Sequence, residues 1–99
     1  MDDKQCVSTT LKFIGSKWTI LILRELCEEK KRFGQLQRAL YGISPKTLSL
    51  RLKELEKNGI IGKKIFAEVP LHVEYSLTQK GMSLKEIISK MKQWGEKYD

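Results

Sequence analysis

The chain begins with three stretches in which apolar residues recur at the three- and four-residue spacing of an α-helix. Gly15 separates the first two stretches, and Ser16 is placed to cap a second helix expected from Lys17 to about Cys27. A polar turn over residues 28–31 is predicted to lead into the third, shorter helix. The apolar positions of these helices are Val7, Leu11 and Ile14; Trp18, Leu21, Ile22 and Leu26; and Phe33, Leu36 and Leu40.

A fourth helix has the most distinct boundaries in the sequence. Ser44 is a preferred N-cap residue, and Pro45 follows at the first helical position, where its missing N–H costs nothing. Gly42 supplies the backbone freedom of a tight turn before the cap, and Gly59 is typical of the position that ends a helix, here after Asn58. The core-facing positions of this helix are predicted to be Leu48, Leu52 and Leu55.

The rest of the chain predicts a β-hairpin and a terminal helix. Residues 60–66 are rich in strand formers, and residues 72–77 alternate between polar and apolar side chains, as a half-buried strand does. The turn between them contains Pro70, which cannot donate within a ladder. Thr78 is expected to cap one last helix, whose apolar face carries Leu84, Ile87, Ile88, Met91, Trp94 and Tyr98.

The order of these elements indicates an α+β fold, mostly helical, in a single domain over residues 1–99. Two short helices around a glycine-containing turn form a helix-turn-helix over about 34–58. The hairpin over about 60–77 makes it the winged variant, and a helix over about 78–98 completes the domain. A chain of 99 residues buries a modest core, so that pairing with a second copy would stabilise it.

The positive charge is concentrated in the predicted helix-turn-helix and the start of the wing. Between Lys30 and Lys64 there are ten basic and two acidic side chains, a balance of +8, whereas nine basic and ten acidic side chains give the rest of the chain −1. A localised positive field attracts polyanions. Nucleic acid is the first candidate, and an anionic membrane surface is the second.

The fourth helix is the element expected to read DNA. Its side opposite the leucines is cationic, and the N-terminal end of a recognition helix points into the major groove, while lysines further along contact phosphates. A core helix with a solvated lysine face would show the same periodicity, so the prediction depends equally on the cap, the hairpin and the charge. The predicted DNA contacts combine residues of the fourth helix and its cap with one arginine before the third helix and two lysines of the wing. They are Arg32, Ser44, Lys46, Thr47, Ser49, Leu50, Arg51, Lys53, Lys57, Lys63 and Lys64.

Two further features concern assembly and redox chemistry. The six apolar residues of the terminal helix recur near heptad spacing and predict a homodimer interface. Cys6 lies ahead of the first predicted helix and near Lys4, a setting that raises thiol reactivity, and is therefore a redox-sensing candidate. Cys27 is expected to be a small apolar residue at the end of the second helix.

Several motifs, in order along the chain, resemble the HxlR-type winged-helix regulators, a branch related to the MarR group. The resemblance spans Cys6 to Trp94 and implies a homodimeric transcription factor on an inverted-repeat operator, with the helix over 44–58 in the major groove. Some members of that family use the cysteine that matches Cys6 to sense oxidants or electrophiles; Val7 stands where proline is usual. The matching motifs are Gly15-Ser16-Lys17-Trp18-Thr19, Arg32-Phe33-Gly34-Gln35-Leu36, Gly42-Ile43-Ser44-Pro45-Lys46-Thr47-Leu48-Ser49, Arg51-Leu52-Lys53-Glu54-Leu55-Glu56, Val69-Pro70, Glu74-Tyr75-Ser76-Leu77-Thr78, Gly81 and Trp94-Gly95.

The sequence offers little support for catalysis, a metal or a cofactor. It has one histidine and no glycine-rich phosphate loop, and Cys6, Cys27 and His72 lack metal-ligand spacing. No apolar run approaches a membrane span and no signal peptide is recognisable, so we expect a cytoplasmic protein without a membrane partner. The alternative function is a winged helix that contacts protein or RNA, in which exposed apolar or acidic residues would replace the lysines of the fourth helix.

Overall fold

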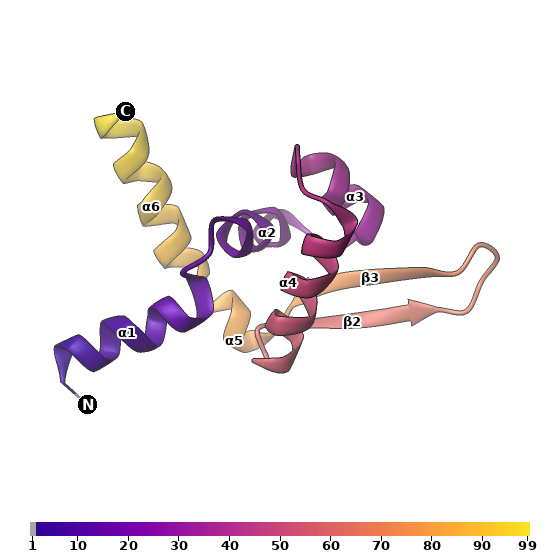
Figure 1. Ribbon diagram of the computed structural model, residues 1–99, viewed down its shortest axis with the longest axis horizontal. Helices are drawn as coiled ribbons and strands as arrows, with labels where there is room; N and C mark the ends of the chain where they lie inside the picture. The colour runs from indigo at the N-terminus through magenta and orange to yellow at the C-terminus, as the bar shows by residue number, and fades with distance from the viewer. Residues whose placement is uncertain (1) are drawn as a thin grey trace.

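The computed structural model describes residues 2–99, a helical body from which a β-hairpin projects (Figure 1). Its principal extents are 49 × 32 × 22 Å, with the hairpin at one end and the diverging first and last helices at the other. The elements in chain order are α1 (Asp3–Ile14), α2 (Lys17–Glu28), β1 (Lys31–Arg32), α3 (Phe33–Ala39), α4 (Pro45–Lys57), β2 (Ile61–Phe66), β3 (His72–Leu77), α5 (Gln79–Met82) and α6 (Lys85–Tyr98).

The hydrophobic core lies around α2. Ile22 and Leu23 of this helix are completely buried, and α3, α4 and the β-sheet all pack against it. The three leucines predicted for the buried face of α4 are 0–2% exposed, which confirms that prediction. Burial of each such side chain contributes about 1.5–3 kcal/mol, so this face fixes the rotation of α4 about its axis. The core therefore determines which side of α4 faces solvent.

The sheet has the strand order β1-β3-β2, and both pairings are antiparallel. The predicted hairpin is present: Ile61 pairs with Leu77, and Phe66 pairs with His72. The short strand β1 is not expected from the sequence, which predicts a polar turn over residues 28–31. Lys31 of this strand pairs with Tyr75, which ties the segment between α2 and α3 to the base of the hairpin.

A buried ion pair explains why a lysine occupies this strand. Lys31 Nζ donates to Glu25 Oε1 at 2.9 Å, and Arg24 Nη2 donates to Glu25 Oε2 at 3.1 Å. The hydrogen bond from Lys31 holds the pKa of Glu25 below its ordinary value against the opposing effect of burial, and the same bond raises the pKa of Lys31. Lys31 is thus an internal cation, although it counted toward the predicted positive surface.

The terminal helix differs from its prediction as a single helix over about 78–98. The chain instead forms the short α5, bends at Ser83 and Leu84, and continues as α6. The bend arises because Leu84 N–H bonds to Gly81 C=O at 3.0 Å, a tighter turn than that of an α-helix. A second expectation was wrong at α2, where Ser16 occupies the N-cap position without a side-chain hydrogen bond to the helix.

The end of β3 is anchored to the loop that follows α4. Thr78 Oγ1 donates to the carbonyl of Gly59 and accepts from Gly81 N–H at 3.1 Å. Gly81 packs so closely against the Ile60 carbonyl oxygen that a Cβ there would overlap it. The Leu-Thr-x-x-Gly motif therefore fixes where α5 starts relative to α4, and with it the direction in which α6 leaves the domain.

Within residues 2–99, no single helix is both long and apolar enough to cross a membrane. α1 and α2 together reach that length and composition, but they are bent by 75° relative to each other. α2 is also the central core helix, and core helices of this kind share the same composition.

Candidate nucleic-acid interface

The solvent-facing side of α4 carries a continuous stripe of exposed residues. Lys46, Leu50, Lys53 and Lys57 recur at i, i+4, i+7 and i+11, so they share one side of the helix. All four are exposed, Leu50 to 52%. They lie opposite the three buried leucines, which hold this stripe outward. We refer to these four residues as the α4 stripe.

The N-terminus of α4 is capped as predicted. Ser44 Oγ accepts from Thr47 N–H at 3.0 Å and lies 3.0 Å from Thr47 Oγ1. Ser44 is therefore occupied as a helix cap, while Thr47 beside it and Ser49, two residues further along α4, are both half-buried. The turn before the cap has the backbone geometry predicted for it, since Gly42 has a φ of 89°.

Two other predicted cations make ion pairs within the chain. Arg51 is half-buried, and its Nη1 lies 3.2 Å from Glu54 Oε2. Lys63 Nζ lies 3.7 Å from Glu56 Oε1. Both pairs are partly exposed and therefore weak, so a phosphate could compete for either cation. The lysines of the α4 stripe differ from Arg51 and Lys63 because they lie on the side of α4 farthest from the core.

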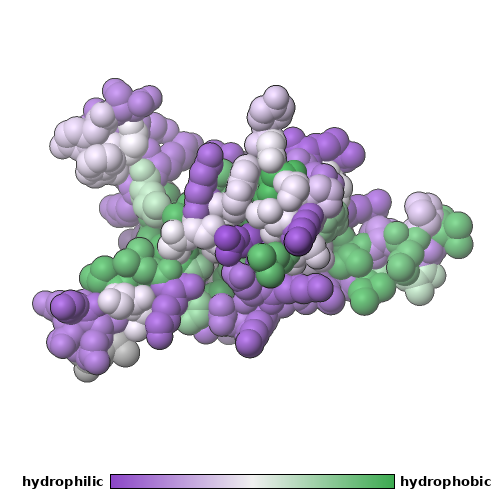
Figure 2. Space-filling model, viewed as in Figure 1, coloured by the Kyte–Doolittle hydropathy of each residue, from purple (hydrophilic) through white to green (hydrophobic). Residues whose placement is uncertain are grey.

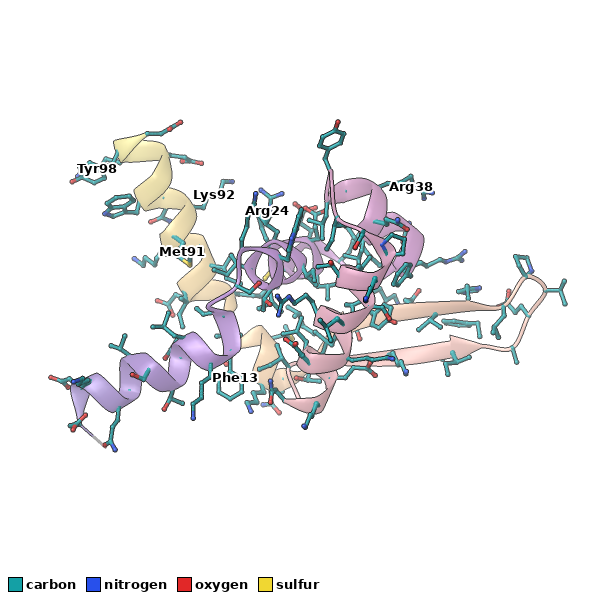
Figure 3. All side chains as sticks on the ribbon, in the orientation of Figure 1. Phe13, Arg24, Arg38, Met91, Lys92 and Tyr98 are labelled. Carbon is teal, nitrogen blue, oxygen red and sulfur yellow. The ribbon has the colours of Figure 1, made fainter. Side chains whose placement is uncertain are left out.

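A second cationic surface lies between α3 and the hairpin. A groove of about 390 Å³ is lined by the cations Arg32 and Arg38, by the polar side chains of Gln35 and His72, and by apolar side chains. Figure 3 shows Arg38 pointing outward from α3. In a helix-turn-helix the first helix crosses the nucleic-acid backbone, so this surface is placed to contact phosphates next to the α4 stripe.

The wing combines a basic middle with an apolar tip. Lys63 and Lys64 are exposed near the middle of β2, where Lys64 Nζ lies 5.0 Å from the centre of the Phe66 ring. Ile65, Val69 and Leu71 are exposed toward the tip, which forms the hydrophobic end of the molecule in Figure 2. The prediction of a basic wing therefore applies to its middle, and the tip is suited to apolar contacts.

Four of the six residues predicted for the dimer face are exposed, all of them on α6. Ile87, Met91, Trp94 and Tyr98 recur at i, i+4, i+7 and i+11 and are 40–67% exposed. Ile88 instead belongs to the core, where it is 6% exposed, and Leu84 packs against that core. The bend before α6 rotates the face so that Ile87, rather than Ile88, points outward.

The helix α1 carries a second set of exposed apolar residues at the same end of the molecule. Val7 is 61% and Leu11 is 57% exposed, and Figure 2 shows a hydrophobic surface over α1 facing the side on which α6 lies. We call the exposed residues of both helices the α1/α6 apolar face; they are Val7, Leu11, Ile87, Met91, Trp94 and Tyr98.

The two cysteines occupy different environments. Cys6 is exposed and lies inside the first turns of α1, not ahead of the helix, because α1 begins at Asp3 behind an Asp2 cap. Cys27 is half-buried at the end of α2, and burial raises the pKa of its thiol. No group of three or more potential metal ligands comes together within residues 2–99.

The predicted site omitted Arg38 and Tyr41. The signal for Arg38 in the sequence is its place on the short helix before the turn, where a helix-turn-helix contacts the nucleic-acid backbone. Tyr41 lies in the turn between α3 and α4 and is 98% exposed. The sequence does indicate this exposed ring, because an aromatic residue next to Gly42 in a predicted turn lies outside the core.

Comparison with known proteins identifies relatives over nearly the whole chain. A family described as HxlR-like helix-turn-helix matches residues 13–99. The helix-turn-helix-type transcriptional regulator YdeP of Bacillus subtilis is 45% identical over 92 residues, which cover 93% of this chain and 72% of YdeP.

Solved structures give the same result. A protein from Porphyromonas gingivalis W83, described as a transcriptional regulator of the MarR family, superposes with a TM-score of 0.93 at 37% identity, covering 100% of this chain and 97% of its own. The redox regulator HypR in its oxidized form superposes with a TM-score of 0.89 at 40% identity, covering 94% of this chain and 96% of the HypR chain. The winged helix-turn-helix described above is thus shared with both.

Proposed function

Because the chain belongs to the HxlR-like helix-turn-helix family and is a DNA-binding transcriptional regulator, we propose that it acts as a homodimer that places the α4 stripe in the major groove. The observation that carries the proposal is the α4 stripe itself: three lysines and one leucine held outward by a fully buried opposite face. The related regulators are not enzymes, and we propose no catalytic role for this chain.

The position of each cation suggests whether it contacts a base or a phosphate. Lys46 lies in the first turn of α4, where an ammonium group reaches guanine O6 or N7, and Leu50 one turn later is suited to a thymine methyl group. Lys53 and Lys57 lie further along and are suited to phosphates, which fix position without reading sequence. Arg32 at the N-cap of α3, Arg38 on α3, and Lys63 and Lys64 on the wing extend the phosphate contacts to either side.

The α1/α6 apolar face supports assembly into a homodimer. It consists of large apolar side chains exposed on two helices, and exposed apolar residues gathered at one end of a molecule mark an interaction site. It also lies at the end of the molecule opposite the hairpin, so that a second copy there would leave both α4 stripes free (Figure 1). A two-fold dimer reads an inverted repeat, with its recognition helices about 34–36 Å apart.

Lys46 and Lys53 are expected to behave differently when each is replaced by alanine. The probes are a duplex that the protein itself selects from a random-sequence library and a scrambled duplex of equal length. Lys46→Ala should weaken binding by about 1–3 kcal/mol on the selected duplex only, whereas Lys53→Ala should weaken both duplexes alike and lower the salt slope by about one. Equal behaviour of the two variants on both duplexes would contradict a base-reading role for Lys46.

Cys6 is proposed as a redox switch on DNA binding, supported by its exposure in the first turns of α1 and by the likeness to the redox regulator HypR. Modification there would add a polar or bulky group next to Val7, at the edge of the α1/α6 apolar face, and so change the dimer geometry. Diamide should release DNA from the wild type and from the control Cys27→Ser, but not from Cys6→Ser. Loss in Cys6→Ser, or retention in the wild type, would overturn the proposal.

A further inference from the structure

A cleft opens between α2 and α6, separate from the DNA-facing elements. Its volume is about 570 Å³, within the range of about 300–1,000 Å³ that small-molecule sites occupy. The two helices are packed against each other at this point, so both walls are regular secondary structure. Figure 3 shows Arg24 of α2 and Lys92 of α6 on facing sides of the cleft.

The floor of the cleft is apolar. Ile20 and Cys27 of α2 and Ile88 and Met91 of α6 line it. Ile88 is 6% exposed, so it belongs equally to the core and fixes the floor in place. Burial raises the pKa of the Cys27 thiol, which keeps the thiol protonated and the floor uncharged at neutral pH.

The rim of the cleft is cationic. Arg24, Lys85 and Lys92 line it, against one acidic side chain among the lining residues, Glu28, which lies 3.5 Å from Lys31 in a partly exposed ion pair. Lys92 is 3.9 Å from Glu96 in a fully solvated pair, which is worth little. Arg24 uses Nη2 to bond Glu25, and a guanidinium has further N–H donors. The rim is therefore complementary to an anion.

The cleft is distinct from the surface proposed for dimerisation. Lys85, Ser89 and Lys92 recur at i, i+4 and i+7 on one side of α6, whereas Ile87, Trp94 and Tyr98 recur on another side. Met91 is the one residue that belongs to both the cleft and the α1/α6 apolar face. A homodimer closed through the α1/α6 apolar face would thus leave the cationic rim accessible.

We propose that this cleft binds a small amphipathic anion, a medium-chain carboxylate, with its carboxylate at the cationic rim and its alkyl chain on the apolar floor. The charge of the rim selects the sign of the headgroup, and the isoleucines and methionine select an apolar tail. A neutral alcohol or a cationic amine of the same length matches the floor but not the rim. The site stands independently of the proposed DNA contacts.

The test uses Cys27 as a reporter inside the cleft. In a Cys6→Ser chain Cys27 is the sole thiol, and its reaction with the neutral reagent 4,4′-dithiodipyridine is followed with increasing octanoate, octanol or octylamine. Octanoate is expected to slow the reaction to a saturating limit. Octanol and octylamine should need at least about tenfold higher concentrations for the same protection of Cys27, because neither can make the charge-assisted contact of a carboxylate with the cationic rim.

Two matched variants separate the rim from general charge. Lys85→Gln/Lys92→Gln is expected to weaken protection by octanoate at least about tenfold. Lys90→Gln, an exposed lysine of α6 outside the cleft, should leave it unchanged. Equal protection by all three ligands, equal affinity in the double variant, or no protection by octanoate would overturn the proposal. Protection of Cys27 that increases with protein concentration alone would show a second copy in the cleft and overturn it too.

Discussion

The affinity of this protein for duplex DNA is expected to fall by about 10³-fold or more between low and physiological salt concentration. The reason is that each phosphate neutralised by a lysine or arginine releases condensed counterions. Added salt opposes this release, so the affinity falls more steeply with salt concentration as the number of such contacts increases. The α4 stripe contributes three lysines; Arg32 and Arg38, at the N-cap and within α3, and Lys63 and Lys64 of the wing add four more cations. Six or more phosphate contacts in the complex give a loss of this size.

The measurement is a titration of the selected duplex at several salt concentrations, with the logarithm of the affinity plotted against that of the salt concentration. A slope of about −5 or steeper is expected, since each phosphate contributes about −0.9. Lys31 should not contribute, because it is held in the buried pair with Glu25. A slope near zero would show that the positive surface does not contact the phosphate backbone.

The second large effect is expected from Trp94→Ala/Tyr98→Ala. The two rings lie 4.9 Å apart and are 67% and 61% exposed, so they form the outer end of the α1/α6 apolar face without supporting the core. Their removal should convert the dimer to a monomer. Each half-site would then be bound separately, and the loss of the second, linked contact is expected to cost about 10²–10⁴-fold in affinity for an inverted repeat.

Light scattering measures the assembly, and titration with a one-half-site and a two-half-site duplex measures the consequence. The double variant should match the wild type on one half-site and lose affinity on two. Tyr41→Ala removes an exposed aromatic ring at the turn before α4 and is the control for assembly. A wild-type protein that is monomeric at micromolar concentration, or a double variant that remains dimeric, would refute this interface.

The parts of the fold that were predicted correctly are those encoded by neighbouring residues. The boundaries of α4 follow from a Ser-Pro start and a glycine stop, and the structure places Ser44 and Gly59 in those roles. The outward stripe follows from the same helix period as the buried leucines. The second strand of the hairpin was likewise indicated by the alternation of polar and apolar side chains in residues 72–77.

The parts that were missed depend on contacts between distant segments. Strand β1 exists because Lys31 reaches back to Glu25 on α2 and pairs with Tyr75 on β3, and neither partner is adjacent in the sequence. The bend before α6 depends on the anchoring of Thr78 and Gly81 to the loop at Gly59 and Ile60. An unbroken helical pattern over 78–98 could not show this bend, so Ile88 was placed on the exposed face.

The central claim is that the α4 stripe, and not the overall charge, binds DNA. Its most direct test compares two variants that each lose three exposed lysines: Lys46→Ala/Lys53→Ala/Lys57→Ala on α4, and Lys12→Ala/Lys90→Ala/Lys92→Ala on α1 and α6. On the selected duplex, the α4 variant is expected to lose at least about 100-fold in affinity, since each contact to a charged group contributes about 1.5–3 kcal/mol, while the control changes by less than about threefold. Equal losses in the two variants would contradict the account.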